Sequence, residues 1–331
     1  MTNKASISLF LLGGTISMAP SSAKGGVVPT VTAEDLCRAI PGIEKIADIV
    51  PQTSKMVASA NLTLQDALNL KDVIEELAIK DNSIVGDLAN GVVIVQGTDT
   101  LEEMAFILDL ILGVDVPVVV TGAMRSANMV SADGPANILA SVIAASTKSL
   151  AKAGVMVVMN DDIHSARYVQ KCHTRDVGAF KSVNGGLIGQ VCEGAVRIAS
   201  IPDQKPRLNI SKNTVIPKVG LLKATLGDDG DLLKSIMAQG YDGLVIEAFG
   251  AGHLPESWLE PLDALLCKMP IMLCSRTLAG PVFENTYGYD GAEIDLIARG
   301  LIPGGILDGP KARLFMQASI MAGKKIKRPE Y

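Results

Sequence analysis

Hydrophobic and polar positions along this chain alternate in blocks that predict strands and helices in turn. Short apolar runs, rich in β-branched residues and typical of strands buried on both faces, occupy 7–12, 92–95, 117–121 and 155–159. Between these runs, apolar residues recur at helical spacing and predict helices at 32–39, 63–77, 101–112 and about 135–146. Strands and helices that alternate in this order predict a parallel sheet with helices on both faces.

The pattern changes after about residue 160, where the chain is more polar and shows only weak strand signals, at 187–191 and 195–198. A second alternation then predicts strands at 219–224, 243–248 and 270–274, and helices at 229–238, 256–267, 292–299 and from Pro310. We therefore predict an α/β protein in two domains. A larger N-terminal domain of the doubly wound, parallel-sheet type spans 1–200, a linker spans 201–217, and a smaller α/β domain spans 218–331.

Composition narrows the class of protein. Apolar residues make up 48% and charged residues 20% of the 331 residues, as in an ordinary folded enzyme. The net charge of −5 and the lack of a long basic run argue against nucleic-acid binding. No apolar stretch approaches the roughly 18–20 residues of a membrane span, which argues against a membrane partner.

The cysteines and histidines carry little signal. The five cysteines are scattered, which favours reduced thiols in a cytoplasmic protein. Neither they nor the three histidines have the spacing of metal ligands, so we predict no metal site. The apolar run at the N-terminus is short and ends at Gly13, so we interpret it as the first strand rather than as a signal peptide.

Two stretches that follow predicted strands carry the candidate chemistry. Residues 97–100, Gly-Thr-Asp-Thr, follow the strand 92–95, and residues 13–15, Gly-Gly-Thr, follow the first strand. The carboxyl ends of parallel strands share one edge of a sheet, where ligands bind and free N–H groups favour an anionic ligand group. We also predict a capping box between Thr100 and Glu103 at the start of the next helix.

Threonine chemistry requires a base as well. Thr15 and Thr98 offer a nucleophile and a second hydroxyl, but a threonine hydroxyl is unreactive near neutral pH until a base removes its proton. Lys171 is the candidate base, provided that it loses its charge in a buried position beside Asp99. Taken alone, each feature also fits a structural role, a capped turn for 97–100 and a surface position for Lys171.

Several motifs, in order along the chain, carry a resemblance. Leu-Leu-Gly-Gly-Thr-Ile-Ser at 11–17 and Gln-Gly-Thr-Asp-Thr-Leu at 96–101 resemble the two signatures of the bacterial L-asparaginase and asparaginase-glutaminase family, which are threonine amidohydrolases. Further segments similar to this family lie at 121–125, 131–135, 157–161, 176–182 and 308–313. The resemblance thus extends from the first predicted strand to the last predicted helix.

This resemblance implies a homotetramer of two-domain subunits that hydrolyses a side-chain amide without a cofactor. It implies that Thr15 is the acylated nucleophile, because Thr15 occupies the threonine position of the first signature. Thr98, Asp99 and Lys171 match the family's Thr–Asp–Lys triad, and Asp99 also helps to hold the substrate's α-amino group. Ser59 matches the serine that holds the α-carboxylate.

The chain departs from the family pattern at several positions. The flap segment 17–30 lacks the tyrosine that helps to activate the first threonine. Gln96 stands where a histidine is usual, and Ala60 replaces a glutamine beside the substrate serine. His253 falls where an asparagine from the neighbouring subunit commonly reaches the site, so we expect His253 to complete the substrate site across a subunit boundary.

The first functional prediction is hydrolysis of the L-asparagine side-chain amide to L-aspartate and ammonia through a threonine acyl-enzyme. A different amide, such as L-glutamine or a D-amino acid amide, is the alternative within the enzyme class. A third hypothesis is a weakly catalytic amino-acid sensor, which keeps Ser59 and Asp99 for binding but lacks the flap tyrosine.

Overall fold

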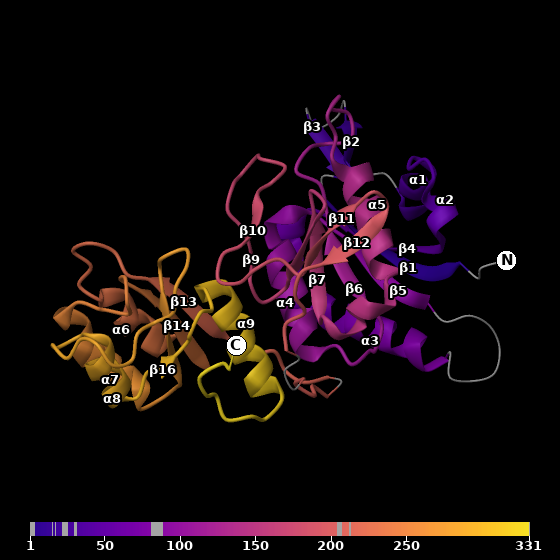
Figure 1. The fold of residues 1–331 in the computed structure, drawn as a ribbon. Coiled ribbons are helices and arrows are strands. Elements are labelled where there is room, and N and C mark those ends of the chain that lie inside the picture. The colour runs from indigo at the N-terminus through magenta and orange to yellow at the C-terminus, as the bar shows by residue number, and fades with distance from the viewer. Residues whose placement is uncertain are drawn as a thin grey trace. The chain divides into compact units, whose positions relative to one another are not determined.

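The computed structural model describes residues 4–14, 16, 18–21, 26–29, 32–80, 89–203, 207–211 and 213–330. The chain divides into two compact units, Met1–Arg207 and Leu208–Tyr331. Each unit combines a β-sheet with helices (Figure 1).

An eight-stranded sheet forms the centre of the first unit, in the order β12-β11-β8-β7-β6-β5-β1-β4. Its parallel part consists of β1 (Ala5–Gly13), β4 (Ala47–Val57), β5 (Ala89–Val95), β6 (Val118–Thr121) and β7 (Val155–Met159). Three antiparallel strands complete one side: β8 (Asp162–Ser165), β11 (Gly189–Cys192) and β12 (Ala195–Ile198). The predicted α/β fold with a larger N-terminal sheet domain is therefore confirmed, and the polar segment after residue 160 supplies its antiparallel side.

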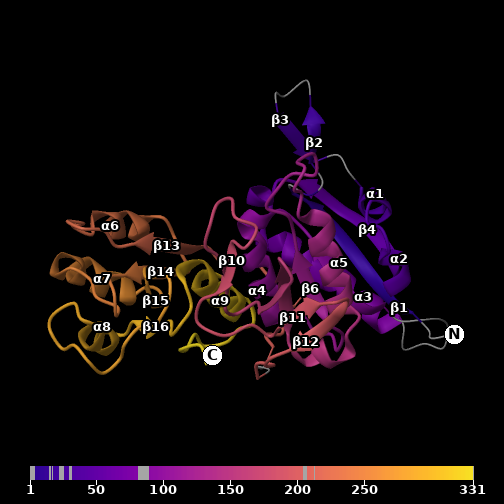
Figure 2. The same cartoon turned by 45° about the horizontal axis from the view of Figure 1, so that its top comes forward.

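Helices cover both faces of this sheet (Figures 1 and 2). On one face lie α1 (Ala33–Arg38), α2 (Ile43–Ile46) and α5 (Gly134–Ala145), and on the other α3 (Leu64–Lys80) and α4 (Leu101–Ile111). Side chains alternate along β1, so Ile7 and Leu9 pack with Ile138 of α5, whereas the fully buried Phe10 belongs to the opposite face. Burial on both faces explains why the strands appear in the sequence as continuous apolar runs.

The second unit is built on a four-stranded parallel sheet of β13 (Val219–Lys223), β14 (Gly243–Ala248), β15 (Ile271–Ser275) and β16 (Ile302–Pro303). Its helices are α6 (Asp231–Ala238), α7 (Leu259–Leu266), α8 (Glu293–Arg299) and α9 (Gly309–Met321). Trp258, 2% exposed, packs in its core with Leu233 and Leu262. The smaller C-terminal α/β domain is thus confirmed. Nowhere in the described part of the chain is a helix both long and apolar enough to cross a membrane.

Two short strand pairs stand outside these sheets, and the hydrophobic pattern predicted neither. One pair is β2 (Met18–Ser21) with β3 (Gly26–Pro29), and the other is β9 (Val169–Lys171) with β10 (Phe180–Ser182). The 3-10 turns include Ser59–Asn61, Thr98–Thr100, Lys148–Lys152 and Glu256–Trp258.

The helix caps test the local sequence signals. Thr32 caps α1 as predicted, because its hydroxyl accepts a hydrogen bond from the Asp35 N–H. The predicted capping box of Thr100 and Glu103 is wrong, since Thr100 makes no side-chain cap at the start of α4. Its hydroxyl instead donates to the Ser59 carbonyl oxygen at 3.0 Å. A partner distant in sequence has therefore taken the hydroxyl that the local motif assigned to the helix.

Candidate active site

Close glycine contacts join the turns that follow the parallel strands of the first unit. Gly14, with φ +92°, packs so tightly after β1 that a Cβ there would lie 2.1 Å from the Gly97 nitrogen. A Cβ on Gly97 would in turn lie 2.6 Å from Ser59 Oγ. Side chains at these positions would push the turns apart, so glycine is required for their approach. The predicted nucleophile Thr15 lies outside the described residues.

Lys171, at the end of β9, reaches the turn after β5. Its ammonium donates to Thr98 Oγ1 at 2.9 Å and to Asp99 Oδ1 at 2.7 Å. The Lys171 side chain is 18% exposed and the Asp99 side chain 68%. Water weakens so open an ion pair, so its contribution to stability is small. The arrangement instead holds an amine against a buried hydroxyl while the Asp99 carboxylate stays open to a ligand.

Ser59 belongs to the 3-10 turn Ser59–Asn61 and is buried beside the same cluster. Its Oγ accepts a hydrogen bond from the Asp99 N–H at 3.3 Å. Because the oxygen acts as an acceptor here, the hydroxyl hydrogen can be donated to an oxygen of a ligand. Ala60 follows in the same turn and is exposed. The structure thus brings together four of the predicted residues, Ser59, Thr98, Asp99 and Lys171, with Ala60 next to them in the chain.

Gln96 connects two parts of this cluster. Its side chain is fully buried, and its Nε2 donates to the Gly97 carbonyl oxygen at 3.2 Å and to Thr100 Oγ1 at 3.4 Å. Within the described residues, its Oε1 has no hydrogen-bond partner. Exchanging the amide oxygen and nitrogen would set two acceptors against each other at Gly97, so the hydrogen bonds favour the present orientation. Gln96 therefore links the turn after β5 to Ser59 through Thr100.

Glu102, in the first turn of α4, is a further neighbour that sequence reasoning missed. Its carboxylate accepts a hydrogen bond from the backbone N–H of Lys171. One signal was available, since Glu102 follows Thr98 by one helical turn and residues at that spacing share a side of a helix. The main-chain partner, however, has no signature in the sequence.

The loop after β6 is fixed by the N-cap residue of α5 and by a side chain within this helix. Asp133 accepts hydrogen bonds from the Met124 and Arg125 N–H groups at 3.0 and 2.9 Å. Asn137 donates to the Gly122 carbonyl oxygen at 3.0 Å and accepts from the Asn160 N–H at 2.9 Å. These contacts give the loop after β6 a defined conformation next to the strand ends.

His253, the last predicted site residue, lies in the second unit. Its Nε2 is 3.2 Å from an oxygen of Glu293, which is fully buried, and its ring packs edge-on against Tyr287 and Tyr289. Burial raises the pKa of the Glu293 carboxyl, but hydrogen bonds from the Tyr287 and Thr286 N–H groups and from His253 outweigh it, so the pKa lies below its ordinary value. Glu293 is therefore a buried carboxylate that holds His253 in place.

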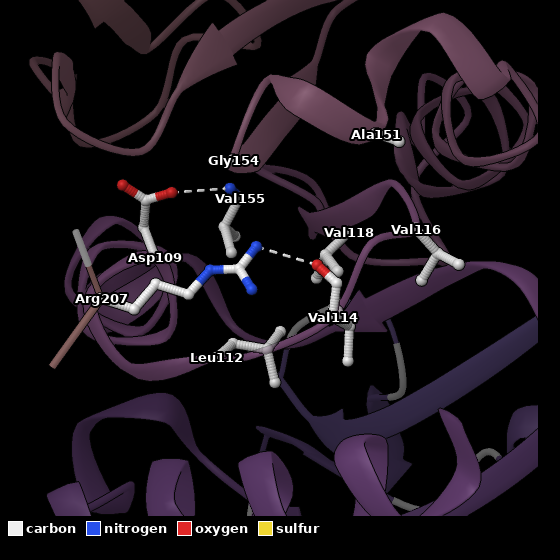
Figure 3. Close-up of a pocket in the computed structure, with 9 residues that line it drawn as sticks. All are labelled: Asp109, Leu112, Val114, Val116, Val118, Ala151, Gly154, Val155 and Arg207. Carbon is white, nitrogen blue, oxygen red and sulfur yellow. Dashed lines mark hydrogen bonds between the residues drawn. The ribbon is translucent and has the colours of Figure 1, made fainter. Parts of the chain in front are cut away.

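A separate pocket opens in the first unit (Figure 3). It is lined by Asp109, Leu112, Val114, Val116, Val118, Ala151, Gly154, Val155 and Arg207. Val118 and Val155 begin β6 and β7, whereas Thr98 follows the end of β5, so this pocket and the threonine cluster lie at opposite edges of the sheet. In the pocket Arg207 donates to the Val114 carbonyl oxygen at 2.9 Å. This hydrogen bond attaches Arg207, the last residue of the first unit, to the segment that precedes β6.

The described residues contain no group of three or more His, Cys, Asp and Glu side chains that could hold a metal ion.

Comparison with known proteins adds the following findings. Residues 6–204 match the family described as Asparaginase, N-terminal, and residues 218–330 match the Glutaminase/Asparaginase C-terminal domain. The chain is 36% identical over 319 residues to a probable L-asparaginase of Deinococcus radiodurans, an alignment that covers 96% of this chain and 93% of the relative. It is 33% identical over 325 residues to L-asparaginase 2 of Escherichia coli, with coverage of 96% and 89%.

Among solved structures, the chain is similar to a probable cytoplasmic L-asparaginase from Campylobacter jejuni. The two share 32% sequence identity at a TM-score of 0.83, over 96% of this chain and 95% of the other. The likeness therefore includes both units and is not confined to the strand-end motifs.

Proposed function

The chain belongs to the asparaginase family, as an amidohydrolase of asparagine-type amides, and we propose that it hydrolyses the side-chain amide of L-asparagine to L-aspartate and ammonia. The observation that carries this proposal is the contact of the Lys171 amine with Thr98 Oγ1 and with the exposed Asp99 carboxylate. An amine, a hydroxyl and an open carboxylate meet there at the carboxyl edge of a parallel sheet, which supports the roles of base, proton relay and acceptor for a ligand ammonium.

In the first step of the proposed mechanism, the Thr15 hydroxyl attacks the amide carbon. The C–N bond then breaks, the nitrogen leaves as ammonia with the proton of the hydroxyl, and the acyl group remains on Thr15 as an ester. Support for this role comes from the neighbour of Thr15 in the chain, Gly14, which packs directly against Gly97 in the turn that leads to Thr98. Backbone N–H groups of these turns stabilise the oxyanion.

In the second step, water attacks the ester carbon, aspartate leaves, and the Thr15 hydroxyl is restored. Lys171, in its neutral form, takes a proton from Thr98, which in turn takes one from the attacking water. The same relay returns a proton to the Thr15 oxygen as the ester C–O bond breaks, so Lys171 is neutral again. The distance of 2.9 Å between Lys171 Nζ and Thr98 Oγ1 suits such a transfer.

Recognition of the substrate uses the groups around this centre. Asp99 holds the α-ammonium, and Ser59 donates its hydroxyl hydrogen to the α-carboxylate. Ala60, small and exposed beside Ser59, leaves room where a longer side chain would stand. His253 of a neighbouring subunit in a homotetramer completes the site, held there by Glu293. The cytoplasmic name of the Campylobacter jejuni relative and the scattered cysteines support a cytoplasmic location.

The test is a coupled ammonia assay on L-asparagine, L-glutamine and D-amino acid amides, with substrate-induced changes in melting temperature measured in parallel. The proposal predicts that L-asparagine gives the highest kcat/KM. A larger kcat/KM for another amide would assign that amide instead. Stabilisation by an amino acid without ammonia release would identify a sensor rather than an enzyme.

A further inference from the structure

The strand that carries Lys171 pairs with β10 along one edge only. β9 and β10 form a two-stranded antiparallel sheet of their own. In such a pair the N–H groups of alternate residues face the partner strand, and those between them face away. Cys172 donates its N–H to the Ala179 carbonyl oxygen at 2.8 Å, so the N–H of the preceding residue, Lys171, faces away from β10.

Glu102 is the acceptor that this outward N–H meets. Glu102 lies in the first turn of α4, directly after the 3-10 turn Thr98–Thr100. The same segment therefore holds Lys171 at two points. Thr98 and Asp99 contact its amine, and Glu102 contacts its backbone.

We propose that Glu102 is a positioning residue, which fixes the backbone of Lys171 to the helix that carries Thr98 and so sets where the amine can lie. The inference rests on the proposed role of Lys171 as a base. A lysine side chain has several rotatable bonds, so contacts at the amine alone do not fix its backbone. A displacement of about 1 Å at a reacting group costs roughly 10²-fold in rate, so a second contact has a direct kinetic value.

The opposite side of the hairpin is attached to the main sheet. Ser182 of β10 lies 2.9 Å from His164 Nδ1 on β8. This contact holds β10, whereas Glu102 holds β9 on the side where the amine acts. Loss of Glu102 is therefore expected to release the Lys171 backbone locally and to leave the hairpin attached.

The test compares Glu102→Ala, Glu102→Gln and Glu103→Ala. Glu102→Ala removes the acceptor and should lower kcat about 10- to 100-fold with KM changed less than about twofold, because Ser59 and Asp99 still bind the substrate. Glu102→Gln keeps an acceptor oxygen without the charge and should retain at least about a third of kcat. Glu103→Ala is the matched control, since it removes a carboxylate from the same helical turn.

The variants distinguish this inference from the proposed function. If Lys171→Met is fully active, the assigned base is wrong and the proposed mechanism fails. If Lys171→Met is inactive but Glu102→Ala keeps wild-type kcat, only the positioning role is overturned. Glu102→Gln below about a tenth of kcat overturns it too, even if Glu102→Ala does not fold, because the charge would then matter rather than the hydrogen bond. In the supported case, Glu102→Ala with Lys171→Met is no slower than Lys171→Met alone.

Discussion

The carboxyl edges of the two parallel sheets carry similar polar residues and use them differently. In the first unit, Thr98, Asp99 and Lys171 contact one another, and the Asp99 side chain is 68% exposed. In the second unit, the buried Glu247 accepts a hydrogen bond from the Gly309 N–H, and Ser275 donates to the Gly250 carbonyl oxygen. Glu247 also pairs with Lys223 at 2.9 Å, and Ser275 also contacts the Thr277 hydroxyl. The polar side chains of this edge are thus engaged by neighbouring groups of the same unit and hold loops in place.

The comparison shows that a polar residue at a strand end is not by itself a functional group. The difference lies in what the side chain contacts and in how far it stays open to a ligand. Glu293 is of the structural kind, since it is fully buried and accepts from two backbone N–H groups as well as from His253. His253 combines a structural contact with a proposed functional one. Its ring is held by Glu293, and we propose that the same ring contacts the substrate.

The largest effect is expected where a strand-end hydroxyl is removed from the open cluster. Thr98→Val keeps the shape of the side chain but loses the group that contacts Lys171, so kcat should fall by about 10³-fold or more. Thr15→Ala should lose turnover to a similar degree. Ser275→Ala, the matched change in the second unit, should keep kcat within about threefold and cost about 1 kcal/mol of unfolding free energy.

Steady-state ammonia release and urea denaturation of the three variants provide the measurement. Thr98→Val or Thr15→Ala at more than a few per cent of the wild-type rate would show that the hydroxyl in question has no catalytic role. An inactive but stably folded Ser275→Ala would show that polar residues at the carboxyl edge of the second sheet also take part in catalysis.

A further large effect is expected at Lys171. Lys171→Met has a similar length but cannot take up or release a proton, so turnover should fall by about 10²-fold or more. Because Asp99 and Ser59 remain, the variant should still bind L-aspartate, which calorimetry can measure. An unchanged rate would return Lys171 to the surface role that the sequence left open.

The sequence predicted the strands whose apolar residues form continuous runs. The runs 92–95 and 155–159 are buried on both faces, and the strands there were predicted. β4 lies at the edge of the sheet and has mostly partly exposed or exposed residues, whereas β9 and β10 contain only three residues each. None of these three strands gives a continuous apolar run in the sequence. Edge strands of this kind depend on partners distant in sequence.

The site shows the same limit. Ser59, Thr98, Asp99 and Lys171 could be selected from motifs and a family resemblance, and the structure brings these residues together. Glu102 was missed, because its spacing from Thr98 is a weak signal and its partner is a backbone N–H that every residue except proline carries. For the same reason the Thr100 capping box was wrong, since the competing acceptor is the Ser59 carbonyl oxygen.

A smaller effect, on binding rather than chemistry, is expected at Ser59. Ser59→Ala loses the hydroxyl that we assign to the α-carboxylate, so KM should rise about 10-fold with a smaller change in kcat. Ser141→Ala is the control, because Ser141 is also buried but donates within α5 to the Asn137 carbonyl oxygen. If KM is unchanged in Ser59→Ala, the carboxylate is held elsewhere.

His253 tests whether the second unit takes part in catalysis. We expect His253→Ala and Thr15→Ala to be inactive separately and to regain part of the activity when mixed as hybrid tetramers, because some sites then contain both wild-type residues. Dilution that dissociates the proposed homotetramer should also remove activity before the subunits unfold. Hybrid tetramers without activity, or a fully active His253→Ala, would show that His253 has only a structural role.

The smallest effect is expected at His164, because its replacement should leave the rate at neutral pH unchanged. This residue is a polar group of the structural kind within the first unit. Its Nδ1 lies 2.9 Å from Ser182 Oγ, and its Nε2 is buried without a partner in the described part of the chain. The pKa of His164 is lowered to about 4, mainly by burial and in part by Lys181, while Asp162 acts in the opposite direction. At neutral pH the ring is therefore uncharged.

The sign of the pH effect follows from the unfolded chain, in which a histidine has a pKa of about 6.5. Between pH 6.5 and 4 the unfolded state binds a proton that the folded state does not, so acid favours unfolding in this window. From pH 7 to 5, His164 should reduce the unfolding free energy by about 2 kcal/mol.

His164→Asn, which can still contact Ser182 but does not titrate, should lack this part of the loss. His173→Asn, a change at an exposed histidine, should keep it. Urea denaturation at both pH values provides the measurement, and the same pH dependence in His164→Asn as in the wild type would show that His164 is not the group responsible.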